Sequence, residues 1–394
     1  MKQVFLILAF LIIASLACAS QAQEKIPPTP IPEGILIHEI PERMDITFDA
    51  IRYVLNDGAC LDKNYEVDKN FINLPDCNAL IYDAQDDGLA SPRQLFAMDI
   101  ETSEVLQITN TDCTHIIGQV VSPTVLMTLA VCADTDGNGK INEKDKPELY
   151  LLNLSTKKMN CLTCEYDLTS INNADYSPIT QKVIFSAQHS SVFHNHLFAI
   201  DAEKNLVQIT EHLDYMDFDC AWSEDGTMIV FNRLPTPWLE APSQIWLMNA
   251  DGSNQAQITS GGTNPNNEEN QGPYPIGLDA DPDLSPDNQK IVFSRLKTGK
   301  ENIIFGVYEL IVIDVDTKEI EILDSQYANM VPQWKDGGIL INRQVGVGAG
   351  ENLTGMGIKQ SLYLYKDGFF TELEEYPFNV FPLGAYGGYW IERE

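Results

Sequence analysis

The sequence predicts an all-β fold in which one four-stranded unit is repeated, and three observations lead to this prediction. A strand pattern recurs along the chain, tight turns recur at matching positions within it, and these turns lie about 46 to 62 residues apart. A period of about 40 to 50 residues is typical of propellers and related repeat architectures. Four short strands per unit, arranged radially, make a β-propeller.

The downstream half of each unit is an apolar strand, a polar turn and a second short strand. Six segments share this pattern, and three of them end in the tripeptide Gln-Ile-Thr. Their first strands begin at Gln94, Glu148, His196, Gln244, Glu309 and Ser361.

The upstream half of each unit is a hairpin, seen best in residues 221–231 and 283–293. Asp-Gly or Asp-Asn at its tip supplies residues that tolerate positive φ in a tight turn. Alignment of the tips gives equivalent positions at Asp76, Thr124, Ile179, Asp225, Asp287, Asp336 and Tyr386. The longest intervals contain recognisable insertions, so the unit itself is constant.

The number of blades follows from how the ring closes. The upstream half occurs seven times, with its last copy at residues 381–393, whereas the downstream half occurs six times. If residues 34–38 and 46–48 supply the missing outer strands, strands from both chain ends close a ring of seven blades. Six blades are the alternative, in which the last copy only adds a strand to the first blade.

Several of these repeats resemble a known family. The segment Trp222-Ser223-Glu224-Asp225-Gly226, the segment Ser285-Pro286-Asp287 and the Gln-Ile-Thr endings are similar to the WD40-like (PD40) repeats of TolB-like propellers. The resemblance covers roughly residues 70–394. It implies a binding platform rather than one chemistry, because such repeats occur in periplasmic protein-binding subunits, in gates of serine peptidases and in other exported proteins. The chain departs from TolB itself, since no N-terminal α/β domain fits before residue 70.

The first 18 residues have the pattern of a secretory signal peptide. Met1-Lys2 precedes an apolar run over residues 4–16, which is shorter than the roughly 20 residues of a transmembrane helix. Ser15-Leu16-Ala17-Cys18 resembles a lipobox, which would lipidate Cys18, whereas the small residues around it also fit ordinary cleavage. Residues 19–32 form a Pro-rich linker, which leaves 33–394 for the propeller. We therefore expect an exported protein, periplasmic or on the cell surface.

The charge composition limits the classes of molecule that the protein can bind. The chain has 57 acidic and 25 basic side chains and a formal charge of −32, so a nucleic acid would be repelled. We expect a monomer whose membrane contact is limited to a lipid anchor. The expected partner is an envelope protein or peptide.

Cysteine usage agrees with export, because a lipidated Cys18 leaves seven cysteines for the folded body. Pairing of nearest neighbours joins Cys60 to Cys77, Cys113 to Cys132 and Cys161 to Cys164, and leaves Cys220 as a buried free thiol. Sequence alone does not assign this connectivity. The Cys-x-x-Cys at 161–164 is also a redox or zinc motif, although no second such pair accompanies it.

A calcium loop is the sharpest local motif. The loop over residues 134–145 matches the pattern D-x-[DN]-x-[DN]-G, with Gly139 sixth. Its expected ligands are Asp134, Asp136, Asn138, the backbone carbonyl of Lys140, Asn142 and Asp145. Asp145 stands where Glu is usual and reaches less far, so we expect modest affinity and a structural role. The alternative is an acidic hairpin tip held by its own hydrogen bonds.

Catalysis has little support in the sequence. It contains no Gly-x-Ser-x-Gly elbow, no phosphate-binding P-loop and no His-Glu-x-x-His motif. We therefore expect a protein- or ligand-binding scaffold of the cell envelope rather than an enzyme. The alternative is a secreted carbohydrate-active enzyme, a glycosidase or lyase, with paired carboxylates in the central channel. Separately, Asp279, Asp281 and Asp283 are candidates to face the central channel and bind a cation or a basic peptide, and the favoured alternative is that they have simple turn and capping roles.

Overall fold

The computed structural model describes residues 53–54, 79–84, 92–99, 105–122, 125–141, 145–153, 156, 158–189, 194–235, 242–260, 278–296, 308–335, 337–347 and 357–376. All of them belong to one compact unit, Pro32–Glu394. The predicted signal peptide and linker, Cys18, Cys60, Cys77 and Asn142 lie outside the described residues. Among the residues described, no helix is long and apolar enough to cross a membrane.

The regular structure consists of β-strands, which pair in consecutive groups of four. The first three groups are β1 (Tyr53–Val54), β2 (Ala79–Ala84), β3 (Gln94–Asp99) and β4 (Val105–Gln107); β5 (Thr114–Ser122), β6 (Val125–Val131), β7 (Glu148–Asn153) and β8 (Lys158–Cys161); and β9 (Leu168–Ser177), β10 (Lys182–His189), β11 (His196–Asp201) and β12 (Leu206–Gln208). The next three are β13 (Tyr215–Trp222), β14 (Met228–Pro235), β15 (Gln244–Asn249) and β16 (Ala256–Gln257); β17 (Asp279–Leu284), β18 (Lys290–Leu296), β19 (Tyr308–Asp314) and β20 (Ile320–Asp324); and β21 (Ala328–Lys335), β22 (Gly338–Val347), β23 (Gly357–Lys366) and β24 (Phe369–Tyr376).

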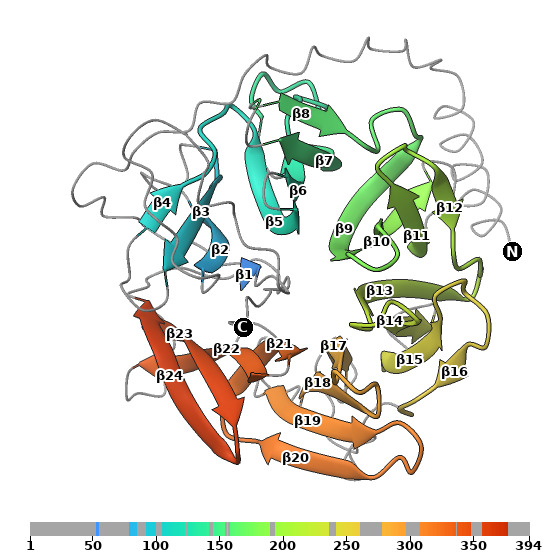
Figure 1. Ribbon diagram of the computed structural model, residues 1–394, viewed down its shortest axis with the longest axis vertical. Helices are drawn as coiled ribbons and strands as arrows, with labels where there is room; N and C mark the ends of the chain where they lie inside the picture. The colour runs from blue at the N-terminus through green and yellow to red at the C-terminus, as the bar shows by residue number, and fades with distance from the viewer. Residues whose placement is uncertain are drawn as a thin grey trace, which may run out of the picture. The chain divides into compact units, whose positions relative to one another are not determined.

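Each group is an antiparallel meander in sequence order, as expected for a propeller blade. A parallel bridge between Tyr308 and Ala328 joins the last two groups into one eight-stranded sheet. The innermost strands β1, β5, β9, β13, β17 and β21 contact one another in succession around the centre (Figure 1). The all-β fold of four-stranded units predicted from the repeats is therefore present.

The described strands form six such units, the number of the six-blade alternative. The favoured seven-blade ring needs residues 34–38, 46–48 and 381–393, which all lie outside the described residues. A seventh blade stays a prediction.

Neighbouring blades pack through apolar residues on both faces of their second strands. In β14, Ile229 and Phe231 lie in a cluster with Ile184 of the preceding blade. Val230, on the opposite face, packs with Ile291 and Phe293 of the following blade. A strand buried on both faces needs an unbroken apolar run, which is why Met-Ile-Val-Phe and Lys-Ile-Val-Phe recur in the sequence.

The Gln-Ile-Thr endings close the blades by two bonds each. The threonine Oγ1 accepts the backbone N–H of the first apolar residue of the third strand, and the glutamine Nε2 donates to the threonine carbonyl. The threonine bonds join Thr109 to Leu95, Thr210 to Leu197 and Thr259 to Ile245, each at 2.9 Å. The glutamine bonds, from Gln107, Gln208 and Gln257, measure 2.7 to 2.9 Å.

A second set of bonds joins successive blades near the centre. In each, a side-chain oxygen on one innermost strand accepts a backbone N–H from the next innermost strand. The bonds run from Tyr176 to Gln119, from Trp222 to Asp175 and from Trp334 to Asp283, each at 2.7 Å. They place several acidic side chains at the centre of the fold.

Candidate functional site

The predicted calcium loop follows β6 and precedes β7. Carboxylate oxygens of Asp134, Asp136 and Asp145 lie within 4.8 Å of one another. Asp145 is 2% exposed, whereas the loop tip is open to solvent. Three carboxylates this close repel one another unless a cation or N–H donors stabilise them.

Backbone N–H groups of the loop point at all three carboxylates, and Asp136 Oδ1 accepts the N–H of Asn138 at 3.0 Å. Asp134 accepts bonds from Gly137, Asn138 and Gly139 at 2.6 to 3.1 Å. Asp145 Oδ1 accepts the N–H groups of Thr135 and Asp136 at 2.7 and 3.0 Å. Gly137 and Gly139 have φ of +74° and +82°, a region that favours glycine.

The set of oxygens suits a hard cation such as calcium. A carboxylate has about four lone-pair sites, and hydrogen bonds within the loop use three at Asp134 and two at Asp136, which leaves lone pairs for a metal. The same N–H bonds would also hold a metal-free hairpin tip, so the calcium assignment remains a prediction.

A small cavity of about 60 Å³ lies among the innermost strands β9, β13, β17 and β21. Its lining includes Asp219, Cys220, Asp281, Asp283 and Gln333. Burial raises the pKa of Asp219 to about 6 and that of Asp283 to about 7. Burial also raises the pKa of Asp281 well above its ordinary value, and the charge of Asp219 adds to that rise. These carboxyl groups therefore hold protons more tightly than exposed ones.

Positive φ angles recur around this cavity. Asn173, Asp219, Asp281 and Val331 have φ between 44° and 51° and occupy matching bulges in four successive innermost strands. Non-glycine residues in this region cost on the order of 1 to 3 kcal/mol each. The repeated bulge turns one backbone segment per blade toward the centre.

The predicted channel carboxylates are only partly brought together. Asp281 and Asp283 line the cavity, but Asp279 does not. Both of its oxygens accept bonds from Arg295, at 2.5 and 2.8 Å. Asp279 therefore does not join the other two at the cavity, because the bulge between Ala280 and Asp283 changes the face on which the later residues lie.

A larger groove, of about 470 Å³, lies between the last two blades. The hairpin turns β17–β18, β21–β22 and β23–β24 form its walls. Its lining includes two aromatic and three basic side chains, namely Trp334, Tyr365, Lys290, Lys335 and Lys366. Sequence reasoning missed this groove, although lysines that flank the turns of adjacent repeats were a usable signal in a chain with 25 basic residues.

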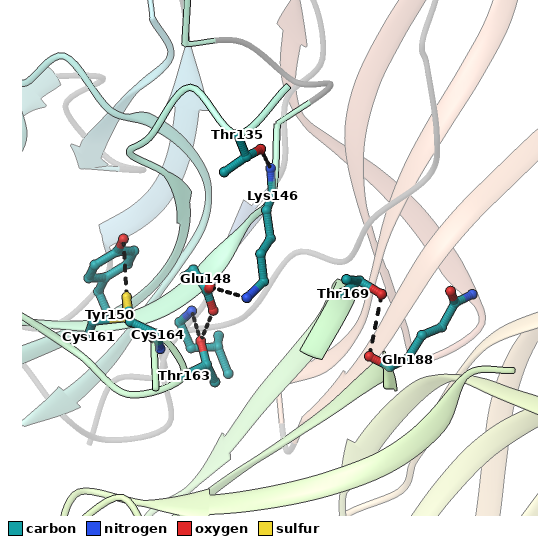
Figure 2. Close-up of polar contacts among 10 residues, drawn as sticks. Thr135, Lys146, Glu148, Tyr150, Cys161, Thr163, Cys164, Thr169 and Gln188 are labelled. Carbon is teal, nitrogen blue, oxygen red and sulfur yellow. Dashed lines mark hydrogen bonds and ion pairs between the residues drawn. A yellow bond between two sulfur atoms is a disulfide. The ribbon is translucent and has the colours of Figure 1, made fainter. Parts of the chain in front are cut away.

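The two described disulfides join the predicted neighbours, Cys113 with Cys132 and Cys161 with Cys164. Cys220 is a buried free thiol, also as expected. Glu148 lies beside the second disulfide (Figure 2), an arrangement that the sequence did not reveal.

Solved structures share this architecture at low sequence identity. The crystal structure of TolB from Acinetobacter baumannii matches with a TM-score of 0.51 and 15% identity, over 75% of this chain and 63% of that one. An oligogalacturonate lyase in complex with manganese matches with a TM-score of 0.53 and 15% identity, over 88% of this chain and 86% of that one.

The fold is that of a TolB-like β-propeller. The chain spans less than two thirds of the Acinetobacter TolB chain, so the likeness extends to the propeller fold alone. A puromycin hydrolase structure matches with a TM-score of 0.49 and 10% identity, over 75% of this chain and 43% of that one. No protein-family model matches the sequence of this TolB-like propeller, and no curated protein matches it.

Proposed function

We propose that this TolB-like propeller is an exported binding scaffold that holds an acidic segment of a partner protein in the groove between its last two blades. The signal peptide at 1–18 exports it, and the protein is then anchored through Cys18 or released. The observation that carries the proposal is the gathering of Lys290, Lys335 and Lys366 around one groove in a chain of charge −32.

The size and lining of the groove support a ligand. Its volume of about 470 Å³ lies within the range of roughly 300 to 1,000 Å³ that is typical of binding pockets. Trp334 and Tyr365 are partly exposed and offer flat apolar surfaces beside the charges. Asp287 also lies at the groove, but its Oδ1 accepts bonds from Ser285 and Gln289 of its own turn. Asp367 lines the groove as well, so three lysines stand against two aspartates and the lining carries a net charge of 3 − 2 = +1. This small positive excess in a strongly acidic chain favours carboxylate-bearing segments.

The groove is also preformed. Gly338 has φ of +133°, and a Cβ there would lie 2.6 Å from the carbonyl oxygen of Tyr365. The two turns of the last blade thus pack too closely for any side chain at this position. A rigid wall reduces the entropy lost on binding.

We further propose that the loop at 134–145 binds calcium and stabilises the second blade. Calcium held by Asp134, Asp136 and Asp145 would neutralise three converging charges and stiffen the β6–β7 connection.

Fluorescence anisotropy with matched peptides tests the groove. We expect a peptide that alternates Glu and aromatic residues to bind, and its Lys-containing counterpart to bind far less. The double variant Lys290→Glu/Lys366→Glu should abolish binding, whereas Lys158→Glu, an exposed lysine of β8, should not. Equal binding of both peptides, or full binding by the double variant, would overturn the proposal.

A secreted carbohydrate-active enzyme is the second candidate, favoured by the raised pKa of Asp219, which suits a general acid near neutral pH. The cavity beside it, at about 60 Å³, has room for only about two water molecules and no sugar ring. Assay of oligogalacturonate breakdown with the wild type and Asp219→Asn decides this candidate. Activity that the variant loses would replace the scaffold proposal.

A further inference from the structure

The Cys161–Cys164 disulfide lies between β8 and β9 and presents its two sulfur atoms unequally. Cys161 is 4% exposed, whereas Cys164 lies in an exposed turn. Thiol–disulfide exchange requires a thiolate to reach one sulfur of the bond. An incoming thiolate can therefore reach Cys164 but not Cys161.

A buried carboxyl group lies beside this bond. An oxygen of Glu148 and both sulfur atoms lie within 4.8 Å of one another. Thr163 Oγ1 donates to Glu148 Oε2 at 2.5 Å, and Lys146 Nζ lies 2.5 Å from Oε1 (Figure 2). Burial raises the pKa of Glu148, although Lys146 and Thr163 oppose the rise. The Glu148 carboxyl therefore takes up a proton more readily than an exposed one, and it lies next to the sulfur that leaves.

Two further groups contact the sulfur atoms. The backbone N–H of Cys164 points at Cys161 Sγ at 3.0 Å, where it would stabilise a thiolate. The hydroxyl of Tyr150 lies 3.9 Å from Cys164 Sγ.

The repeat shows that the fold does not need a covalent link here. Cys161-Leu162-Thr163 occupies the position of Gln-Ile-Thr in the other blades, and Thr163 Oγ1 accepts the N–H of Leu149 at 2.9 Å as its counterparts do. Three blades close this position with a glutamine hydrogen bond instead of a disulfide. The blade should therefore stay folded when the Cys161–Cys164 disulfide is reduced, as a reversible exchange site requires.

The other described disulfide, Cys113–Cys132, provides a contrast in the same region. Cys113 is 1% exposed and Cys132 is half-buried, so neither cysteine lies in an exposed turn as Cys164 does. Among the described residues, neither of its cysteines belongs to a cluster with nearby acidic groups. We therefore expect Cys113–Cys132 to be a structural disulfide that does not undergo exchange.

We propose that Cys161–Cys164 is a thiol–disulfide exchange site for thiol-bearing peptides or small thiols. The thiolate of the co-reactant attacks Cys164 Sγ, and the bond to Cys161 breaks. Its electron pair leaves on Cys161 Sγ, which takes the proton held by Glu148. A second thiol then attacks the co-reactant's sulfur in the mixed disulfide, and Cys164 leaves and is protonated. Overall, two thiols are oxidised to one disulfide, and Cys161–Cys164 is reduced to two thiols.

Glutathione serves as the probe, in a Cys220→Ala background that removes the buried free thiol. The protein is equilibrated in glutathione buffers of increasing reducing strength, and alkylated peptides are identified by mass spectrometry. We expect Cys161–Cys164 to open and close while Cys113–Cys132 stays oxidised and circular dichroism stays native. If both disulfides open together and only on unfolding, the proposal fails.

Single-cysteine variants test the direction of attack. Cys161→Ser should form a mixed disulfide with glutathione at Cys164, whereas Cys164→Ser should not form one at Cys161. Equal trapping in both variants would contradict the proposal.

Glu148→Gln tests the proton-holding group. Exchange should become about 100-fold slower at neutral pH, the lower end of a typical general acid–base contribution. Glu165→Gln is the matched control, because Glu165 follows Cys164 directly but is exposed and pairs with Lys204 at 2.8 Å. Equal exchange rates in the two variants, with native circular dichroism in both, would exclude the assigned role.

Discussion

Replacement of Asp217 by alanine should be among the most destabilising single changes in this propeller. Asp217 lies on β13 and pairs with Arg233 on β14 through two bonds, of 2.7 and 3.0 Å. The side chains are 1% and 3% exposed. The substitution would leave a guanidinium group buried without its counter-ion.

The expected cost follows from what remains around Arg233. Removal of one partner of a buried ion pair typically costs about 3 to 5 kcal/mol. Gln255 still accepts one bond at 3.0 Å, and the ring of Trp246 lies 4.6 Å from the guanidinium carbon. Both contacts are present with and without Asp217 and so do not offset the loss, and the free energy of unfolding should fall by about 3 to 5 kcal/mol.

Urea unfolding followed by tryptophan fluorescence measures this loss as a lower transition midpoint. The control is Glu165→Ala, which removes an exposed partner of Lys204 and should leave the midpoint unchanged. The double variant Asp217→Leu/Arg233→Met should regain much of the loss, because no charge is then left buried. A midpoint for Asp217→Ala equal to that of the control would refute the reasoning.

Three further predictions concern the loop, the centre and the groove wall. Chelation of calcium should lower the melting temperature of the wild type but not that of Asp134→Ala/Asp136→Ala, and an unchanged wild-type value would remove the calcium assignment. Burial raises the pKa of Asp283 from 3.8 to about 7. The stability that this carboxyl contributes is therefore present below about pH 4 and is lost as the pH rises toward 7. Asp283→Asn should flatten that decline in urea titrations at several pH values. An unaltered slope would show that this carboxyl does not titrate as described. Gly338→Ala should lower the melting temperature more than Gly137→Ala does. A Cβ at position 338 would meet the Tyr365 carbonyl, whereas a Cβ at position 137 would meet open space. Equal melting temperatures would show that the last blade can relax.

The repeat and the convergence of carboxylates in the 134–145 loop were predictable because their signals are local. Gln-Ile-Thr bonds lie within one hairpin, so the same letters produce the same bonds wherever they occur. The loop at 134–145 likewise brings its own carboxylates together within a short turn. Nearest-neighbour pairing of Cys113 with Cys132 worked for the same reason.

The centre was harder to predict, because one bulge changes the face on which each residue lies. Simple alternation places Asp279, Asp281 and Asp283 on one side of a strand. The φ of 51° at Asp281 breaks that alternation. Asp279 consequently pairs with Arg295, and the other two line the cavity.

The sequence by itself determined the fold class, the repeated unit and the acidic loop at 134–145, since each depends on residues close together in the chain. The structure selected the pairs Cys113–Cys132 and Cys161–Cys164, which nearest-neighbour pairing had favoured. Only the tertiary structure placed Lys290 beside Lys335 and Lys366, because the groove forms where separate repeats pack side by side. The contact of Glu148 with Cys161 and Cys164 is local to the β7–β8 hairpin, but only the structure revealed it, because no repeated residue pattern marks it. Contacts between units depend on packing geometry, and no local pattern of residues encodes that geometry.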